Sequence, residues 1–418
     1  MKTLNKAVAR YNGISLIVRI LIGLIAGAVL ALAAPGAGWV SEFGNLFVGA
    51  LKGIAPVLVF VIVASALAQG SSKLDRRFGT VIWLYMLTTF LAAAIAVITS
   101  FLFPVKVVLA DAAQSDVIPQ GLGEVMGTLL TNFVANPVSA IMSGNYIGIL
   151  FWACMFGVAM KKIGSESTKT FMANTADAVS QIVRWIINLA PFGIMGLVYT
   201  NVSGNGLAIF TQYGKLLALL VGTMLFMALI VSPFIMFIYL GCNPYPLVFR
   251  CLRESGLTAF FTRSSAANIP VNMALCEKLS LDKDMYSVSI PLGATINMDG
   301  AAITITIMTL AAANTLGIQV SLPAAIVLSA MSALGACGAS GVAGGSLLLI
   351  PMACSLFGIS NDVAMQMVGV GFIIGVVQDS VETALNSAGD VEFAATAEYH
   401  QWLKQGKPLP EFLSGKKN

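Results

Sequence analysis

Long apolar runs that match the thickness of a lipid bilayer constrain this chain more than any other feature of its sequence. An α-helix rises about 1.5 Å per residue, so roughly 20 apolar residues cross the hydrocarbon core. Only 10% of the residues are charged and 57% are apolar, a composition unlike that of soluble proteins. Apolar runs precede residue 245 near residues 15–34, 45–68, 79–103, 147–160, 170–200 and 213–240. The sequence therefore predicts an all-α integral membrane protein.

The basic residues between the runs predict how the chain is oriented. The first run is long enough to span and lacks the pattern of a signal peptide, so we expect it to be the first transmembrane helix. With the N-terminus inside, the opposite loops hold little basic charge beyond Lys106. The positive-inside rule then places both termini in the cytoplasm, provided that the chain crosses the membrane an even number of times. The basic residues on the inner side are Lys2, Lys6, Arg10, Lys73, Arg76, Arg77, Lys161, Lys162, Lys169, Arg250 and Arg253.

Residues 253–390 contain four apolar segments, two of which are rich in small and polar residues. These two, residues 255–273 and 323–357, are predicted to be re-entrant helical hairpins, because Ser, Asn and Pro interrupt the first and a glycine cluster interrupts the second. Each is followed by a helix with polar residues, 285–316 and 362–397, and the two units run in opposite directions. The prediction is eight transmembrane helices plus two re-entrant hairpins arranged as inverted repeats.

A stripe of polar side chains follows one face of the last predicted helix. Its members recur at i, i+3, i+4, i+7 and i+11, which places them within about 100° of one another around a helix. Three of them are carboxylates, and ionisable groups inside a membrane are costly and usually functional. The stripe consists of Asp379, Glu382, Thr383, Asn386 and Asp390. We expect it to line a polar site.

In the preceding helix Thr295, Asn297 and Asp299 occur at every second position, which a regular helix cannot place on one face. We therefore expect the helix to unwind there and to expose backbone carbonyl groups as ligands. Asn and Asp offer hard oxygen donors, which suit a small hard cation. Tyr85, Thr88 and Thr89 share a face in the third helix, where packing hydroxyls are the more common explanation.

The buried charges call for a cation. The predicted site contains four carboxylates and one guanidinium group, which sum to a net charge of minus three if all are ionised. The carboxylates are Asp299, Asp379, Glu382 and Asp390, and the guanidinium belongs to Arg263. At roughly 2.5 to 3.5 kcal/mol per uncompensated charge, bound cations or protons must make up the deficit. Sodium and protons are both candidates for the coupling cation. The single histidine, His400, is expected to be solvated in the tail, which weakens the case for a proton relay.

Other function classes find little support in the sequence. No catalytic triad, organic-cofactor motif or metal-ligand spacing appears, so the chain is not expected to be an enzyme. The basic residues are dispersed and form no patch for nucleic acid. The six cysteines show no CxxC spacing and are expected to be ordinary buried thiols.

Three stretches resemble the dicarboxylate/amino acid:cation symporter family, which has the glutamate-transporter fold: Thr262 to Ser265, Asn297 to Gly300, and Asp379 to Asp390. The likeness covers essentially the whole chain and is strongest to bacterial members that carry serine and threonine. It implies a homotrimer in the bacterial cytoplasmic membrane. Residues 1–245 would form the trimerisation scaffold plus helices 3 and 6 of the transport domain. Residues 246–400 would form the transport core, which moves like an elevator with the hairpin tips as gates, and residues 401–418 would be a cytoplasmic tail.

The resemblance also implies roles for individual residues. Asp379 would hold the substrate ammonium, Asn386 and the backbone of Ser265 would hold its carboxylate, and Val342 would close over it, with Arg263, Ser264, Glu382 and Thr383 beside it. One sodium ion would bind Asp390 with carbonyl groups of Gly293, Asn297 and Asn386. A second would bind Asp299, Asn297, Tyr85, Thr88 and Thr89, and a third would bind carbonyl groups near Thr295 and the second hairpin.

Two departures from the family pattern point to the substrate. Members that carry acidic substrates have an arginine where this chain has Glu382, and a threonine where it has Ala301. Glu382 would repel a second carboxylate, but it can accept a hydrogen bond from a small hydroxyl or pair with Arg263. The expected activity is sodium-driven uptake of L-serine and L-threonine. A proton-coupled carrier of neutral amino acids and an ion channel are the alternatives.

Overall fold

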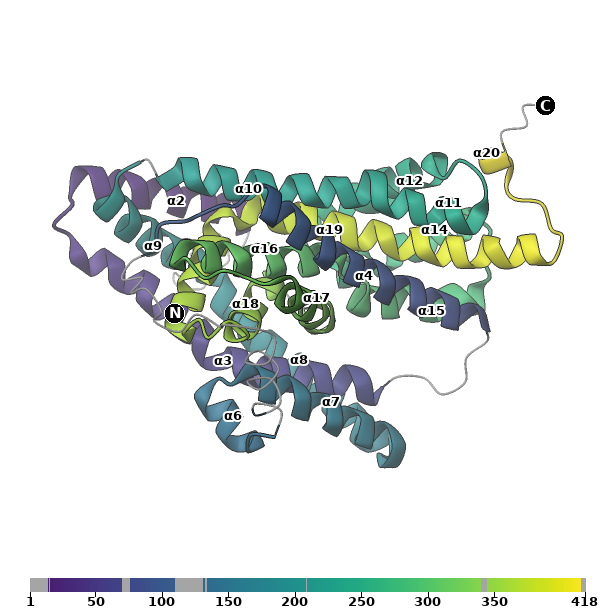
Figure 1. Cartoon of the computed structure of the whole chain (residues 1–418), viewed down its shortest axis with the longest axis horizontal. Coiled ribbons are helices and arrows are strands. Elements are labelled where there is room, and N and C mark those ends of the chain that lie inside the picture. Colours follow the sequence, from purple (N-terminus) through teal and green to yellow (C-terminus); the bar gives the residue numbers. More distant parts are fainter. Residues whose placement is uncertain are drawn as a thin grey trace, which may run out of the picture.

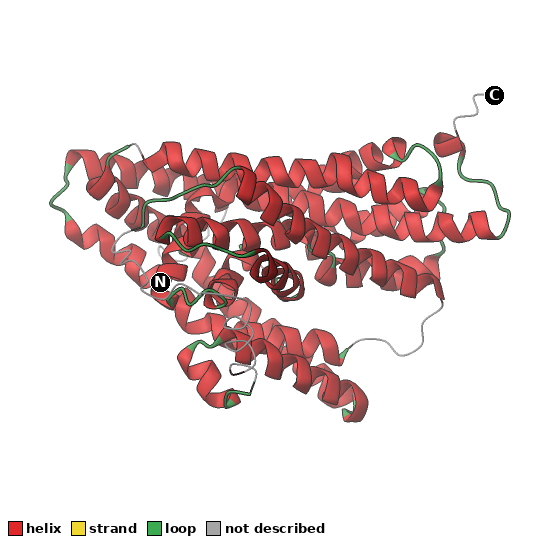
Figure 2. Cartoon of the chain, viewed as in Figure 1, coloured by secondary structure: helices red, strands yellow, loops and turns green. Residues whose placement is uncertain are grey.

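The computed structural model is helical throughout the part of the chain that it describes, namely residues 14, 16–69, 76–109, 131, 134–207, 209–339 and 344–414. Figure 2 shows helices joined by loops, with no strand in these residues. Six helices in them are long and apolar enough to cross a membrane, or seven if one bent pair counts as a single span. The prediction of an all-α protein with several membrane-crossing helices is therefore confirmed.

One group of helices, here called the outer helices, lies to the left and below in Figure 1. Within it α2 packs against α9, and α3 packs against α7, α8 and α9. A short helix, α6 (Pro137–Ser143), precedes α7. The outer helices are α2 (Leu16–Ala33), α3 (Ser41–Ala68), α7 (Tyr146–Ile163), α8 (Glu166–Asn188) and α9 (Ala190–Asn205).

The single helix predicted over residues 170–200 is wrong in one respect, because the structure has two helices there. The axes of α8 and α9 differ by 54° at a break around Leu189. Pro191 lies in the first turn of α9. A proline is tolerated in a first turn but not in a helix interior, where it removes a hydrogen bond and collides with the preceding turn. This residue explains the bend.

A second group surrounds two long helices in the centre. The helix α19 (Asn361–Lys404) has 44 residues and runs along the long axis of the molecule. Beside it lies α16 (Asp299–Leu316), which continues α15 (Lys283–Ile296) after a break. We call α15, α16 and α19 the inner helices. They are covered by α4 (Arg76–Leu102), α10 (Ile209–Phe226) and α11 (Ser232–Leu240), the last two joined by a π-helical turn, Met227–Val231.

Residues 245–278 form a helix–turn–helix that packs on α19. The first arm comprises α12 (Tyr245–Cys251), a π-helical turn (Leu252–Gly256) and α13 (Leu257–Thr262), and the second arm is α14 (Ser265–Lys278). The first arm begins earlier than the predicted residue 255. The interruption was predicted from Ser, Asn and Pro residues. In the structure it lies at Arg263 and Ser264, and Pro270 stays inside α14. Arg263 has the left-handed φ of 50°, and the Ser264 hydroxyl caps α14 by accepting a hydrogen bond from the Ala267 amide.

The glycine-rich segment is also interrupted, as predicted. Helix α17 (Leu322–Ala336) ends just after Gly335, the first glycine of the cluster, and the chain resumes with a 3₁₀ turn, Gly345–Leu349, and α18 (Ile350–Ser355). Val342, at the tip of the predicted second hairpin, lies outside the described residues, as do residues 110–130 of the predicted outer connection.

The expectation that His400 is solvated is wrong. Helix α19 continues through this residue to Lys404, so the ring faces the neighbouring α11. Its Nδ1 lies 2.8 Å from the carbonyl oxygen of Tyr239, and the two rings meet edge to face with centroids 5.1 Å apart. The sequence predicted the helix end seven residues too early, near Ala397, which placed His400 in the tail.

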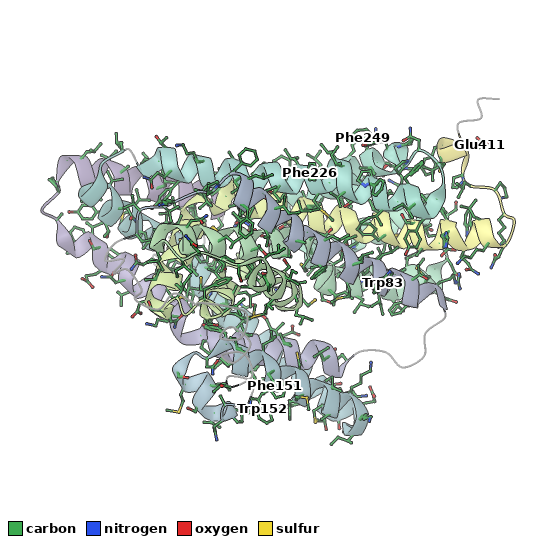
Figure 3. All side chains as sticks on the ribbon, in the orientation of Figure 1. Trp83, Phe151, Trp152, Phe226, Phe249 and Glu411 are labelled. Atoms are coloured by element: carbon green, nitrogen blue, oxygen red, sulfur yellow. The ribbon has the colours of Figure 1, made fainter. Side chains whose placement is uncertain are left out.

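Bulky apolar side chains cover the outside of the molecule. Figure 3 shows Trp83, Phe226 and Phe249 directed away from the helix bundle, and each is about half exposed. Water is a poor surrounding for so many exposed aromatic and aliphatic groups, whereas lipid tails are a good one.

Candidate functional site

The inner helix unwinds where the sequence predicts. Helix α15 ends at Ile296 and α16 starts at Asp299, and between them Asn297 (φ −91°, ψ 80°) and Met298 (φ −121°, ψ 49°) are not helical. Asn side chains compete for backbone hydrogen bonds and so favour such breaks. The break turns Asn297 toward α19 and places its amide beside Asp390.

Asp390 is completely buried and receives hydrogen bonds from two sides. The Asn297 Nδ2 donates to Asp390 Oδ1 at 3.1 Å and also lies 3.1 Å from the Asn386 carbonyl oxygen. The Tyr85 hydroxyl, from α4, donates to the Asp390 carbonyl oxygen at 2.8 Å. The Asn297 Oδ1 is buried and has no hydrogen-bond partner among the described residues. A buried oxygen without a donor next to a carboxylate fits a hard cation.

Gly293 makes the close approach around Asp390 possible. A Cβ atom at this position would lie 2.7 Å from Asp390 Oδ1 and 2.9 Å from the Tyr85 hydroxyl. Both distances are shorter than van der Waals contact, so any side chain here would push the carboxylate or the tyrosine away. Gly293, Asn297, Asn386, Tyr85 and Asp390, all predicted as cation ligands, therefore lie together.

The second predicted carboxylate of the cation sites, Asp299, is also buried and contacts α4. Thr89 Oγ1 donates to Asp299 Oδ1 at 3.0 Å and accepts a hydrogen bond from the Met298 amide at 3.2 Å. The hydroxyls of Thr88 and Thr295 instead donate to carbonyl oxygens of their own helices, at 2.9 Å to Leu84 and 2.7 Å to Leu292. Thr89 thus joins Asp299 directly.

At the hairpin tip Arg263 forms an ion pair with Asp379. The Nε atom lies 3.2 Å from Asp379 Oδ2, and both side chains are more than nine-tenths buried. The Gly344 amide donates to the other carboxylate oxygen at 3.2 Å. The cavity between Arg263, Gly344 and Asp379 has a volume of about 10 Å³. That is room for at most one water molecule between these described residues.

Glu382 lies one turn further along α19 and has different partners. Its Oε2 accepts hydrogen bonds from the hydroxyls of Thr304 at 2.7 Å and Ser346 at 2.9 Å, and from the Gln378 amide. The pairing with Arg263, one of two roles expected for Glu382, does not form because Arg263 contacts Asp379 instead. Glu382 is thus an acceptor for hydroxyl groups.

The remaining predicted substrate residues are buried near this pair. The Asn386 Oδ1 accepts a hydrogen bond from the Gly300 amide at 2.7 Å, and the Thr383 hydroxyl donates to the Asp379 carbonyl oxygen. Ser265 is 7% exposed at the first turn of α14. Every predicted residue of the stripe on α19 is buried, as the periodicity predicts.

Sequence reasoning missed several buried polar residues that contact the site. Gln378, Thr304 and Ser346 hold Glu382, and only the i, i+4 spacing of Gln378 and Glu382 could have indicated this. Glu392 is 3% exposed on another face of α19. Four further residues, Ser255, Asn268, Asn272 and Ser387, form a hydrogen-bonded cluster between the hairpin and α19.

Charge compensation around the site is incomplete. No Lys, Arg or His nitrogen in the described part of the chain lies within ion-pair distance of the Asp299, Glu382 or Asp390 carboxylates, whereas Asp379 has Arg263. In these same residues no cluster of three His, Cys, Asp or Glu side chains forms a metal site. Carboxylate, amide and hydroxyl oxygens are donors that suit hard cations rather than soft ones.

Comparison with known proteins gives one family and several close relatives. The model of the sodium:dicarboxylate symporter family matches residues 16–399. A protein of Bifidobacterium adolescentis named serine/threonine transporter SstT is 75% identical over 407 residues, which are 97% of this chain and 95% of that protein. Proteins with the same name from Streptococcus agalactiae (60% identical over 92% of this chain and 96% of the relative) and Streptococcus thermophilus (55% over 96% and 100%) are also similar.

Proposed function

This chain belongs to the sodium:dicarboxylate symporter family, and from that premise we propose that it imports L-serine and L-threonine together with sodium ions. The family and the relatives' names identify a multi-pass membrane transporter and not an enzyme. The observation that carries the proposal is the set of buried carboxylates on the inner helices that have no basic partner in the described part of the chain, namely Asp299, Glu382 and Asp390.

Sodium is proposed to bind at the break between α15 and α16. The Asp390 carboxylate, the unpartnered Asn297 Oδ1 and carbonyl groups of Gly293 and Asn386 are the proposed ligands of one ion. Asp299 with Thr89 is proposed to bind another, together with Tyr85, Thr88 and Asn297, and carbonyl groups near Thr295 a third. Sodium prefers such oxygen ligands, and its charge offsets the carboxylates in a medium where each uncompensated charge costs about 2.5 to 3.5 kcal/mol.

The substrate is proposed to bind between the two hairpin tips. Its ammonium would replace Arg263 at Asp379, and its carboxylate would meet Asn386 and the backbone at Ser265. The side-chain hydroxyl would then reach Glu382, whose Oε2 already accepts hydrogen bonds from two hydroxyls. A site built to accept a hydroxyl hydrogen discriminates against a second carboxylate, which supports serine and threonine over acidic amino acids.

The layout proposed for the membrane has eight spans and two re-entrant hairpins, residues 245–278 and 322–355. Most of residues 1–245 would form the scaffold of a trimer. Helices α4, α10 and α11, which also lie in this range, would belong to the transport domain, and residues 246–400 would form the core of that domain. Both termini would lie in the cytoplasm. The core would move as a unit past the outer helices, with Val342 and Ser264 at the tips that open for the substrate.

The test is uptake of labelled serine into proteoliposomes. We expect accumulation with an inward sodium gradient, inhibition by excess threonine, and little inhibition by aspartate. Equal accumulation when choline replaces sodium would contradict sodium coupling. Uptake controlled by a pH gradient alone would identify proton coupling, and substrate-independent currents at single-channel rates would identify a channel.

A variant at Glu382 tests the substrate assignment separately. We expect Glu382→Arg to weaken serine uptake at least about tenfold, or about 1.4 kcal/mol, because it replaces the acceptor for the hydroxyl with a donor. Glu382→Gln serves as a control that keeps the size and one acceptor oxygen, and it should retain more activity. Unchanged serine kinetics in the arginine variant would refute the role of Glu382.

A further inference from the structure

The helix–turn–helix of residues 245–278 is joined to α19 by a cluster of polar side chains that the substrate and cation assignments leave unused. We call Ser255, Asn268, Asn272 and Ser387 the asparagine cluster. All four are completely buried. Ser255 belongs to the first arm, the two asparagines to the second arm, and Ser387 to α19. The cluster therefore connects three segments.

The hydrogen bonds of the cluster converge on Ser387. The Asn268 Nδ2 lies 2.7 Å from Ser387 Oγ, and the Asn272 Nδ2 lies 3.1 Å from the same atom and 3.0 Å from the Ser387 carbonyl oxygen. The Ser255 hydroxyl donates to Asn272 Oδ1 at 2.5 Å. Both arms of the hairpin are thus tied to one residue of α19.

Asn272 also reaches the Asp390 carboxylate, one turn beyond Ser387 on α19. Its Nδ2 lies 3.5 Å from Asp390 Oδ2, while the Asn297 Nδ2 donates to Asp390 Oδ1 at 3.1 Å. The two carboxylate oxygens therefore have donors from two different segments, the hairpin and the break between α15 and α16. The Asn297 contact is the shorter of the two, and the Asn272 amide lies at the outer limit of hydrogen-bond distance.

Separating the hairpin from α19 would break these bonds together. A buried donor or acceptor left without a partner costs about 1–3 kcal/mol, and a lipid core offers no water in exchange. The acceptor Asn268 Oδ1 already lacks a donor among the described residues. The cluster therefore has no spare donor that could replace a broken hydrogen bond. The seated hairpin is consequently one discrete state, in which Asp390 is held by Asn272.

We propose that Asn272 is a positioning residue that couples seating of the hairpin on α19 to cation binding at Asp390. The proposal rests on the sodium site proposed above. A hairpin that leaves α19 takes away the Oδ2 donor and lets the carboxylate rotate. By linkage, a cation that requires the fixed carboxylate favours the seated hairpin to the same extent. Sodium occupancy and the position of the hairpin are then one equilibrium.

Cys276 provides a reporter for seating. It lies on α14 one turn beyond Asn272 and is completely buried. In a full-length parent whose other five cysteines are replaced by alanine, Cys276 is the only thiol. The experiment measures the rate of its alkylation by N-ethylmaleimide in proteoliposomes as sodium replaces choline at constant ionic strength. Sodium should slow the reaction with a defined midpoint concentration.

We expect Asn272→Leu, which has a similar volume but no donor, to raise the sodium midpoint about tenfold, or about 1.4 kcal/mol. Asn272→Thr keeps a hydroxyl donor and should give a smaller increase, and it tests the proposal if the leucine variant does not fold. The matched control is Asn201→Leu, because Asn201 donates to the Leu197 carbonyl oxygen within α9, among the outer helices. Its midpoint should change less than about twofold.

The outcomes separate the two proposals. In one outcome, sodium slows the alkylation of Cys276 in the parent with the same midpoint as in Asn272→Leu and Asn272→Thr. That result would overturn the coupling but leave the sodium site intact. A parent that sodium does not protect would overturn the sodium site itself, and the coupling with it. A shift of the midpoint in the control as large as in Asn272→Leu would also overturn the coupling, because the effect would not depend on contact with Asp390.

Discussion

The outer and inner helices both have the length and apolar composition of membrane spans, yet their surroundings differ. The buried share of the most apolar 18-residue window is 44% in α3 with its preceding turn and 39% in α7. For residues 283–316 the share is 94%, and for α19 it is 83%. The outer helices thus leave large apolar faces uncovered within this chain, whereas the inner helices face other helices.

This difference explains where the polar groups lie. A helix in contact with lipid has nothing to hydrogen-bond a charged side chain, so its exposed face must be apolar. An inner helix is covered on all sides, so its neighbours can supply donors and acceptors, as Thr304 and Ser346 do for Glu382. Apolar length alone identifies both kinds of helix as spans, but only the inner kind can hold a site.

The largest effect is expected from neutralising Asp390. Asp390→Asn removes the buried negative charge proposed to bind sodium, and we expect sodium-dependent serine uptake to fall about 100-fold or more, equivalent to about 2.7 kcal/mol. Initial uptake rates in proteoliposomes measure this. The control is Asp362→Asn at the exposed start of the same helix, where Asp362 pairs with Lys52. Exposed ion pairs contribute about 0–1 kcal/mol, so the control should lose little activity.

A smaller effect is expected from adding a single carbon atom at Gly293. Gly293→Ala places a Cβ atom 2.7 Å from Asp390 Oδ1, so the carboxylate must shift. We expect the sodium concentration for half-maximal uptake to rise about tenfold, or about 1.4 kcal/mol. Gly53→Ala in α3 is the matched control, because a Cβ atom there meets no atom within 4 Å. Similar sodium dependence in both variants would break the distinction between inner and outer helices.

Removing one hydroxyl partner of Glu382 should have a more moderate effect. Thr304→Val keeps the shape of the side chain but removes a donor, and Ser346 and Gln378 remain. Of the 1.5–3 kcal/mol typical for a hydrogen bond to a charged group, we expect about 1 kcal/mol to be lost, a rise of about fivefold in the KM for serine. Thr309→Val on the same helix, whose hydroxyl oxygen lies 3.9 Å from the Cys354 Sγ, should leave the KM unchanged. Equal KM values in the two variants would contradict the role of Thr304.

The smallest effect is expected on the outer helices. Leu46 of α3 is 70% exposed, so Leu46→Ala removes only contacts with lipid. Serine uptake and the temperature of unfolding should both stay near those of the parent. Leu51→Ala, on the same helix but completely buried, should lower that temperature, since emptying a packed site typically costs about 2–5 kcal/mol. A large loss in Leu46→Ala would show that this face is covered by protein.

Features that depend on neighbours in the sequence could be predicted. The stripe on α19 follows from the helical period, and the break at Asn297 and Met298 follows from polar residues that no single helical face accommodates. Helix ends are harder to predict, because they depend on competition between nearby turns. The early end predicted for α19 is why His400 was placed in the tail.

Partners that are far apart along the chain could not be predicted. Asn272 and Ser387 are 115 residues apart, and Thr304 and Glu382 are 78 apart, so no local period relates them. The choice of Arg263 between Asp379 and Glu382 is of the same kind, because both carboxylates lie on the stripe and only the position of the hairpin tip decides.

The sequence by itself determined that this protein lies in a membrane, that its last third carries buried charge, and which face of the last helix bears it. These properties follow from hydrophobicity and helical periodicity, which act along the chain. Only the tertiary structure decided which helices are covered, that Asn297 donates to Asp390 with Asn272 close by, and that Arg263 pairs with Asp379. Such contacts depend on how helices pack in space, where a shift of about one ångström makes or breaks a hydrogen bond.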